Sequence, residues 1–423
     1  MRILHIAQRY LPALGGAERH LHELSSRLVA EGHQVTVITT DSLDFELFWD
    51  PSCRRVRERE SYYEGVRVIR LPVSHVPMPQ LAYPAIRRLL WLMSQVSVIP
   101  TGLMWKLARY TPWVPALWKW IEEDQGHYDI VGGMTICFEP LLEAGRRFAK
   151  RIGAPFVVYP LTHLGAGHRP GQDSLSRFYT MRHQVELVKR SDAVVAQTTT
   201  EKKFYVEQGL LPRRIVVAGV GVNPQDLLGG EGARFRQRYK VESHLVASVT
   251  KLSYDKGVFH LVEAIQRLRR SGIAVSLALA GDILSPFRRF WKQLSDADKQ
   301  GVILLGRISE EEKRDLLAAC DVFAMPSRTD SFGIAYLEAW LYKKPVIAAK
   351  TWGVTDIVEH EKNGLVVQFG DVDALASAIL RLVKHPEQRA ALGENGFQRV
   401  LSEHTWDHKY PMIRNLYLEL SSR

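Results

Sequence analysis

Short apolar runs rich in β-branched residues alternate with longer stretches of helical periodicity along most of the chain. In the first half these runs lie near residues 3–7, 35–39, 66–70, 128–133, 156–160, 193–197 and 215–219. In the second half they lie near residues 244–249, 274–281, 302–306, 322–326, 344–349 and 364–368. Near-continuous apolar strands separated by helices are typical of parallel sheets covered on both faces. The pattern therefore predicts an α/β chain with two doubly wound, Rossmann-like domains.

A Gly-rich segment without periodicity, residues 219–232, separates the two series of strands. Such a segment is typical of a connection between domains. We therefore expect an N-terminal domain of residues 1–222 and a C-terminal domain of residues 223–403. Residues 404–423 are predicted to form a C-terminal helix that crosses back to the N-terminal domain.

Composition narrows the class of protein. The 423 residues are 46% hydrophobic and 24% charged, which indicates a soluble globular chain long enough for two cores. The net charge is 56 − 46 = +10, which favours phosphorylated small molecules, nucleic acid or an anionic membrane as partners. The three cysteines are widely spaced and indicate a reducing compartment. Because no signal-peptide pattern or long apolar span is evident, we expect a cytoplasmic protein.

Two loops that follow strands carry features of an anion site, and ligands of such sheets bind outside the carboxyl ends of the strands. In "LGGAER", Gly15 and Gly16 precede a helix and would let backbone N–H groups approach an anion. Their spacing differs from G-x-G-x-x-G, which argues against a dinucleotide site. In "VTKLSYDKG", Lys251 and Lys256 flank a loop that enters a helix. This arrangement fits a diphosphate clamp, and a solvated surface pair is the alternative.

The segment "PSRTDSFGIAYLEAW", residues 326–340, places one acid before a predicted helix start near Phe332 and a second acid inside the helix. The backbone N–H groups that would face outward there belong to Gly333, Ile334 and Ala335. Asp330 could accept hydrogen bonds from hydroxyls, and Glu338 could reach a ribose. Alternatively, Asp330 or Ser331 is an N-cap and Glu338 is a structural acid.

The segment "YPLTHLGAGH" contains two histidines beside a strand end. His163 follows the strand directly, and His168 lies in the Gly-rich loop beyond it. Either histidine could be structural or catalytic.

Taken in order, these segments resemble the GT-B glycosyltransferases of the retaining family 4 type. The resemblance includes "GGAER", the histidine after the strand, "KLSYDKG", "LAGD", "LGRISEEE", "SFGIAYLEA" and "WGVTDIVEHEKNGLVV". It covers nearly the whole chain and ends in a Trp-containing C-terminal helix. It implies two Rossmann-like domains that face each other across a cleft, the first binding the acceptor and the second the nucleotide sugar.

The resemblance also implies a role for the two spaced acids. Asp330 and Glu338 keep the eight-residue spacing of the family's Glu-x7-Glu signature, although Asp replaces the first Glu. Asp330 would then meet the hydroxyls of the donor sugar, and Glu338 the ribose of the nucleotide. The helix start between them would hold the phosphates through Phe332 and the N–H groups of the residues that follow it.

By the same resemblance, Lys251 and Lys256 would hold the diphosphate and stabilise the leaving group. Lys251 replaces the usual Arg, and Thr250 stands where Gly is usual. Gly16 would lie against the donor phosphates, and His163 would contact the sugar and stabilise an oxocarbenium-like transition state. Retention would proceed by front-face attack, without the carboxylate nucleophile of the usual retaining glycosidases.

We expect no cofactor and no metal, because the two lysines neutralise the diphosphate. The acidic pairs Asp371-x-Asp373 and Asp296-x-Asp298 are interpreted as a helix cap and a polar connection. The expected donor is a nucleotide sugar, with UDP preferred to GDP.

The acceptor side contains an unusual segment, residues 75–120. Seventeen uncharged residues separate Arg88 from Lys106, and tryptophans with flanking cations follow. Such a segment suits peripheral contact with an anionic membrane surface, on the inner face of the membrane. The alternatives are helices that cover the first sheet or form a dimer contact.

The sequence thus predicts a metal-independent retaining glycosyltransferase that acts on a glycan or lipid-linked acceptor, in polysaccharide biosynthesis. The alternatives are a nucleotide-sugar epimerase on the same fold and a non-catalytic protein that binds nucleotide sugar or lipid. No nucleic-acid motif is evident, so nucleic acid is not an expected partner.

Overall fold

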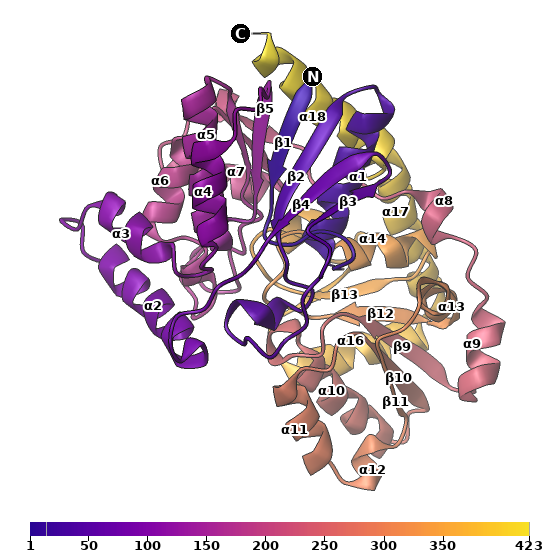
Figure 1. Ribbon diagram of the computed structural model, residues 1–423. Coiled ribbons are helices and arrows are strands. Elements are labelled where there is room, and N and C mark those ends of the chain that lie inside the picture. Colours follow the sequence, from indigo (N-terminus) through magenta and orange to yellow (C-terminus); the bar gives the residue numbers. More distant parts are fainter. Residues whose placement is uncertain (14, 423) are drawn as a thin grey trace. The chain divides into compact units, whose positions relative to one another are not determined.

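The computed structural model describes residues 1–13 and 15–422 and divides into two compact units. The N-terminal unit comprises Met1–Leu164, Gly171–Gly219 and Lys409–Arg423. The C-terminal unit comprises Gly165–Pro170 and Val220–His408. Each unit contains one twisted sheet with helices packed against it (Figure 1).

The sheet of the N-terminal unit has eight strands in the order β3-β4-β2-β1-β5-β6-β7-β8. The strands are β1 (Arg2–Ile6), β2 (Gln34–Thr40), β3 (Glu60–Tyr63), β4 (Val66–Leu71), β5 (Ile130–Met134), β6 (Phe156–Tyr159), β7 (Ala193–Ala196) and β8 (Ile215–Val217). All neighbours pair in parallel except β3, which is antiparallel to β4. Every strand predicted for this half is present, whereas the edge strand β3 was not predicted.

The helices of this unit connect the strands. They are α1 (Gly16–Ala30), α2 (Pro79–Ser94), α3 (Thr101–Ala108), α4 (Pro115–Glu123), α5 (Glu139–Ile152), α6 (Arg182–Lys189) and α7 (Thr199–Glu207). Some of them lie on the faces of the sheet, whereas α2 and α3 project beyond it and pack against other helices (Figure 1). Short 3-10 turns are η1 (Phe45–Phe48), η2 (Ile136–Phe138), η3 (Ser176–Phe178) and η4 (Pro212–Arg214). The predicted uncharged segment therefore forms α2, α3 and the turn between them.

The sheet of the C-terminal unit has six parallel strands in the order β11-β10-β9-β12-β13-β14. They are β9 (His244–Val249), β10 (Val275–Ala280), β11 (Val302–Gly306), β12 (Val322–Met325), β13 (Val346–Ala349) and β14 (Gly364–Val367). Two apolar clusters cover its two faces, one around Trp340 and the other around Leu261. Burial on both faces explains why these strands read as continuous apolar runs.

The helices of the C-terminal unit surround this sheet. They are α8 (Pro224–Leu227), α9 (Gly232–Tyr239), α10 (Val258–Arg270), α11 (Ser285–Gln293), α12 (Asp296–Lys299), α13 (Glu310–Ala319), α14 (Ile334–Leu341), α15 (Val354–Ile357), α16 (Val372–Lys384) and α17 (Pro386–Glu403). The 3-10 turn η5 (Tyr254–Lys256) precedes α10. Asp371 caps α16, since its side chain accepts from the backbone N–H of Ala374, which confirms the cap interpretation. The predicted polar connection at Asp296 is wrong, because these residues form α12 with Ser295 as its cap.

Helix α18 (Trp406–Ser421) contributes to both units, because the chain passes from the C-terminal to the N-terminal unit at residues 408–409. Its Tyr417 is fully buried in the N-terminal unit. The Tyr417 hydroxyl lies 3.0 Å from Nε2 of His5 on β1 and 2.8 Å from the hydroxyl of Tyr159 on β6. This end of α18 is therefore part of the core that supports the first sheet.

Candidate functional site

The lysine-containing loop and the acidic loop of the C-terminal unit emerge from neighbouring strands. Strand β12 pairs in parallel with β9, with Val322 opposite Val246 and Phe323 opposite Ala247. The carboxyl ends of the two strands therefore lie at the same edge of the sheet. This adjacency brings residues 250–257 and 326–333 together, although they are distant in the sequence.

An ion pair joins the two loops at the predicted site. Lys256 Nζ lies 2.8 Å from Asp330 Oδ1, and both side chains are mostly shielded from solvent. Beside it, Arg328 Nη2 lies 2.7 Å from Asp255 Oδ1, and the Arg328 backbone N–H donates to the Asp255 carbonyl. Asp255 and Lys256 of the first loop thus pair with Arg328 and Asp330 of the second loop.

Two close backbone approaches fix the shape of the lysine loop. Gly257 has φ +74°, and a Cβ at this position would collide with the carbonyl oxygen of Pro326. Gly281, in the "LAGD" motif, has φ +131°, and a Cβ there would collide with the carbonyl oxygen of Thr250. Only glycine suits both the left-handed backbone and the available space. Lys251, which follows Thr250, is half-buried at this edge.

Helix α14 begins later than predicted. Its first residue is Ile334, and its N-cap is Gly333, which has φ +92° and no capping side chain. The predicted start near Phe332 is therefore too early, and neither Asp330 nor Ser331 is the N-cap. A Cβ on Gly333 would lie 2.5 Å from the ring of Tyr336, so a side chain is excluded there.

The residues around the α14 start differ in exposure. Phe332 is 3% exposed and packs edge-on against the ring of His404. Ile334 and Ala335 are half-buried. The first N–H groups of a helix have no partner within the helix, and they carry its positive end. This end of α14 follows directly on the loop that holds Asp330.

The two spaced acids have different partners. Glu338 lies one turn inside α14 and is 6% exposed, and its Oε1 accepts a hydrogen bond from Lys313 Nζ at 3.0 Å. Lys313 lies on α13 and also pairs with Glu310 at 2.8 Å. The structure therefore brings Asp330 to Lys256 and Glu338 to Lys313. Lys313 is therefore the buried counter-charge of Glu338.

In the N-terminal unit, His163 lies in the loop after β6. Its ring stacks on Tyr179 with the centroids 4.5 Å apart and the planes inclined by 22°. The preceding Thr162 is held by α7, because its N–H donates to Glu201 Oε1 at 2.6 Å and its hydroxyl lies 2.8 Å from that of Tyr205. Burial raises the pKa of Glu201, although hydrogen bonds from Gln197 and Thr162 oppose the shift. His168 is exposed.

The glycine pair of the N-terminal unit lies at the start of α1. Gly15 is the extended N-cap, and Gly16 is the exposed first residue of the helix. A Cβ on Gly15 would collide with the carboxylate of Glu18. Glu18 is 3% exposed and pairs with Arg9 at 2.9 Å. This buried carboxylate occupies the space behind the helix start, which explains why Gly15 carries no side chain.

Several supporting residues were not singled out from the sequence. Asp255 and Arg328 join the two loops, Lys313 pairs with Glu338, and Glu201 holds the backbone beside His163. Glu201 had a readable signal, because Thr198 three residues earlier accepts from its N–H as in a capping box. The other pairs depend on which strands and helices are neighbours, and local patterns do not contain this information.

Two family models match the chain and together cover both units. The model described as "Glycosyl transferase 4-like domain" matches residues 15–221. The model described as "Glycosyl transferases group 1" matches residues 231–399. The two matches meet near the boundary between the units.

Curated relatives include a GDP-mannose-dependent alpha-(1-6)-phosphatidylinositol monomannoside mannosyltransferase from Mycobacterium tuberculosis. It is 33% identical over 185 residues, which is 41% of this chain and 48% of the relative. The chain thus spans about half the length of this relative. A glycogen synthase from the same organism is 25% identical over 435 residues, covering 99% of this chain and 94% of the relative.

Solved structures match over the whole chain. Sucrose-phosphate synthase from Thermosynechococcus elongatus has a TM-score of 0.74 at 19% identity, covering 100% of this chain and 99% of that one. Anabaena HepE in complex with UDP has a TM-score of 0.70 at 20% identity, covering 99% of this chain and 100% of that one. These likenesses establish the fold, and they confirm the prediction of two Rossmann-like α/β units.

Proposed function

We propose, from the premise that this chain belongs to the GT4-type glycosyltransferases of the GT-B fold, that it transfers a sugar from a nucleotide-sugar donor with retention of configuration. The observation that carries this proposal is the pairing of Lys256 with Asp330 at the shared edge of β9 and β12. It joins a cation suited to a diphosphate to an acid suited to sugar hydroxyls. Both lie beside the start of α14.

In the proposed reaction, Lys251 and Lys256 bind the donor diphosphate, together with the first N–H groups of α14. The bond between the sugar C1 and the phosphate oxygen breaks as the new bond from the acceptor oxygen forms on the same face. The departing phosphate takes the proton of the acceptor hydroxyl. The lysines stabilise the negative charge that develops on the diphosphate, and the step assigns no role to a metal ion.

The acids and the histidine are proposed to position the donor. Asp330 accepts hydrogen bonds from sugar hydroxyls, and Glu338 binds the ribose of the nucleotide. Gly15 and Gly16 let the start of α1 approach the donor phosphates. His163, held in orientation by its stacking on Tyr179, contacts the sugar and stabilises its oxocarbenium-like transition state.

A thermal-shift panel of UDP- and GDP-sugars tests this proposal on the wild-type chain and on Lys256→Ala, with and without EDTA. A ligand that binds the native state raises the melting temperature by mass action. We expect a shift with one nucleotide series that is lost in Lys256→Ala and is indifferent to EDTA. Absence of a shift with every donor, on folded protein, would favour a non-catalytic function.

The donor proposal includes a choice of nucleotide base, guanine or uracil. The Mycobacterium relative is named as GDP-mannose-dependent, whereas HepE was solved with UDP and with UDP-glucose. Both bases are therefore arms of the panel. UDP is our proposed donor base, and a shift confined to GDP-sugars would overturn this choice.

The acceptor is proposed to be a glycan or a lipid-linked saccharide, bound by the N-terminal unit. Helices α2 and α3 and their turn expose large apolar side chains to solvent: Leu81, Leu89, Leu92, Val96, Val98 and Leu103. Among the residues described, no helix is long and apolar enough to span a bilayer. We propose peripheral contact of residues 75–120 with an anionic membrane surface, because exposed apolar residues beside cations favour the membrane interface.

A further inference from the structure

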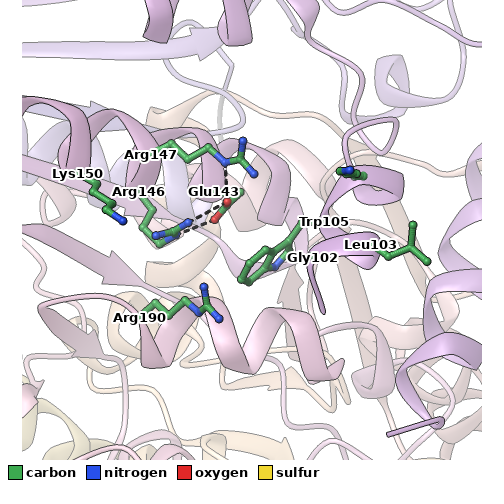
Figure 2. Close-up of a pocket in the computed structure, with 9 residues that line it drawn as sticks. Gly102, Leu103, Trp105, Glu143, Arg146, Arg147, Lys150 and Arg190 are labelled. Atoms are coloured by element: carbon green, nitrogen blue, oxygen red, sulfur yellow. Dashed lines mark hydrogen bonds and ion pairs between the residues drawn. The ribbon is translucent and has the colours of Figure 1, made fainter. Parts of the chain in front are cut away.

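A pocket of about 610 Å³ lies on the N-terminal unit between α3, α5 and the end of α6 (Figure 2). It is lined by Gly102, Leu103, Trp105, Lys106, Glu143, Arg146, Arg147, Lys150 and Arg190. None of these residues belongs to the proposed donor site. The pocket also shares α3 with the apolar surface of residues 75–120.

The lining of this pocket carries a large excess of positive charge. It contains five cations and one acid, so its formal charge is 5 − 1 = +4. The acid, Glu143, is 2% exposed and accepts from Arg146 Nε at 2.8 Å and from Arg147 Nε at 2.7 Å (Figure 2). A single buried carboxylate thus orients two arginines but neutralises only one of them. Within the described part of the chain, no acid pairs with Lys106 or Lys150.

Aromatic rings hold the arginines of the pocket in place. The guanidinium of Arg190 lies 4.8 Å from the ring centroid of Trp105, and that of Arg146 lies 5.8 Å from it. Trp105 is itself fixed, because its Nε1 donates to the carbonyl of His183 at 3.1 Å. Unlike an ion pair, a cation–π contact orients a cation without cancelling its charge. Arg190 also pairs with Glu186, which lies outside the lining, its Nε being 2.8 Å from Oε1. With this acid counted, the pocket keeps a formal charge of 5 − 2 = +3 that is available to an external anion.

A second tryptophan extends the same arrangement next to the pocket. Arg109 lies 3.9 Å from the ring centroid of Trp118, and Arg147 lies 5.6 Å from it. Burial lowers the pKa of Arg109, and the charge of Arg147 lowers it further. The positive charges of Arg109 and Arg147 therefore repel each other at this position. An anion bound among them would relieve this repulsion.

The apolar surface beside the pocket lacks acids, and hydrogen bonds hold its turn in place. From residue 65 to residue 121 the sequence contains no Asp or Glu. Arg182 holds the turn between α2 and α3 through hydrogen bonds to the carbonyls of Val96 and Ile99, both at 2.7 Å. The most exposed apolar side chain, Val98 at 84%, lies in this turn. A fixed apolar edge without acids is compatible with an anionic surface.

We propose that this pocket binds the phosphate of an anionic phospholipid headgroup while the turn between α2 and α3 enters the apolar boundary of the membrane. The inference rests on the membrane contact proposed above and gives it a specific site. Arg146, Arg190 and Lys106 would contact the phosphate oxygens. The combination of a cationic pocket with an exposed apolar turn favours a membrane over a soluble polyanion, because a soluble polyanion would not cover the apolar side chains of the turn.

The test is binding of the whole chain to phosphatidylcholine vesicles with and without phosphatidylglycerol, measured by flotation in the absence of any donor. The variant is Arg146→Gln with Arg190→Gln. The matched control is Lys203→Gln with Arg213→Gln, which removes the same charge from exposed positions of the same unit. We expect the pocket variant to bind anionic vesicles roughly tenfold to thirtyfold more weakly than wild type and the control to change by less than about twofold.

The outcomes separate this inference from the proposals on which it depends. If wild type ignores anionic vesicles, both the membrane contact and the pocket are wrong. If wild type binds but the two double variants weaken binding equally, the membrane contact stands and the pocket is wrong. Because no donor is present, failure of the donor proposal would not affect either result.

Two further variants keep the test decisive. Arg190→Gln alone, at a side chain 46% exposed, repeats the measurement if the double variant does not fold. Val98→Asp should also weaken binding, since the turn is proposed to enter the membrane. If Val98→Asp binds as wild type does, or if a single-stranded oligonucleotide binds more tightly than anionic vesicles, the occupant is a soluble polyanion and the proposal fails.

Discussion

The two units use their acids in opposite ways. In the C-terminal unit, acids at the site pair with cations from neighbouring elements, as in Asp330 with Lys256 and Glu338 with Lys313. In the N-terminal unit, Glu139 and Glu143 are buried among the helices. The arginines nearer the surface contact tryptophan rings, and Arg190 also pairs with Glu186. In the first arrangement, Lys256 and Lys313 already have acidic partners when no ligand is bound. In the second, cations outnumber acids, so net positive charge remains at the pocket.

This difference indicates two ways of binding an anion. A ligand at the C-terminal site must take the place of an existing partner, so binding there exchanges one set of hydrogen bonds for another. Such exchange favours selectivity, because a ligand that replaces only one partner leaves a charge poorly paired. A ligand at the N-terminal pocket meets cations that are already oriented. Such a surface favours fast and salt-sensitive association with many anions.

The largest expected effect comes from the buried acid of the N-terminal unit. Glu139 is fully buried, with Arg87 Nη1 2.5 Å and His183 Nε2 2.9 Å from its Oε1. Burial alone would raise the pKa of Glu139, but the Arg87 charge and the hydrogen bonds from His183 and Gln184 hold it below the ordinary value. Glu139→Gln should cost about 3–5 kcal/mol of unfolding free energy, because it leaves Arg87 buried without its counter-charge.

Urea unfolding measures this loss. The control is Glu60→Gln, which removes an acid whose ion pair with Arg67 is 45% exposed on both sides and should change stability by less than about 1 kcal/mol. Equal stability of the two variants would mean that burial of Glu139 has no energetic role. The contrast between buried and exposed acids would then be wrong.

The next effect concerns the closed pair of the C-terminal unit. Lys256→Ala should lower the rate of sugar transfer about 100-fold to 1000-fold, because it removes one of the charges proposed to stabilise the leaving diphosphate. Release of the nucleoside diphosphate measures the rate. Lys362→Ala, which breaks an exposed pair with Glu359 in the same unit, should leave the rate within about twofold. A Lys256→Ala enzyme as fast as this control would remove Lys256 from the mechanism.

A third prediction concerns pH and the N-terminal unit. Burial lowers the pKa of His20 from 6.5 to about 4. Between pH 6.5 and about 4, His20 therefore binds a proton in the unfolded chain but not in the folded unit. The free energy of unfolding accordingly falls as pH falls through this range. The loss is on the order of 3 kcal/mol. Urea midpoints across this window should show it, and His20→Gln should flatten the curve; an equally steep curve in that variant would assign the loss to other groups.

The smallest effect tests the aromatic support of the pocket. Trp118→Leu keeps an apolar side chain but removes the ring beneath Arg109 and Arg147. Binding to anionic vesicles should weaken about threefold, which corresponds to a cation–π contribution of about 0.5–1 kcal/mol. Trp352→Leu, in the C-terminal unit, is the size-matched control. An unchanged affinity in Trp118→Leu would limit the aromatic support to Trp105.

The sequence was sufficient for the strands but not for the pairs between them. Buried parallel strands appear as apolar runs, whereas the edge strand β3 is the polar segment "ESYY" and has no such signal. The spacing of Asp330 and Glu338 was visible, but their partners Lys256 and Lys313 were not, because they come from other elements of the fold. Likewise, the pocket gathers Trp105, Arg146 and Arg190 from three helices, and no local pattern predicts this.

The helix start before α14 shows the same limit on a smaller scale. Asp330 and Ser331 are both good N-cap residues, so the sequence placed the start near Phe332. Gly333 is instead the cap, with a left-handed backbone and no room for a side chain beside Tyr336. Asp330 pairs with Lys256 of the lysine loop, so a tertiary contact overrides its local preference for capping.

The position of Tyr417 on α18 has a consequence for how the protein is made. A ribosome completes residues 1–219 early, yet the core of that unit lacks Tyr417, which meets His5 and Tyr159, until the whole C-terminal unit has been synthesised. Domains generally fold in the order in which they emerge. Here the unit that emerges first cannot complete its core until α18 has emerged.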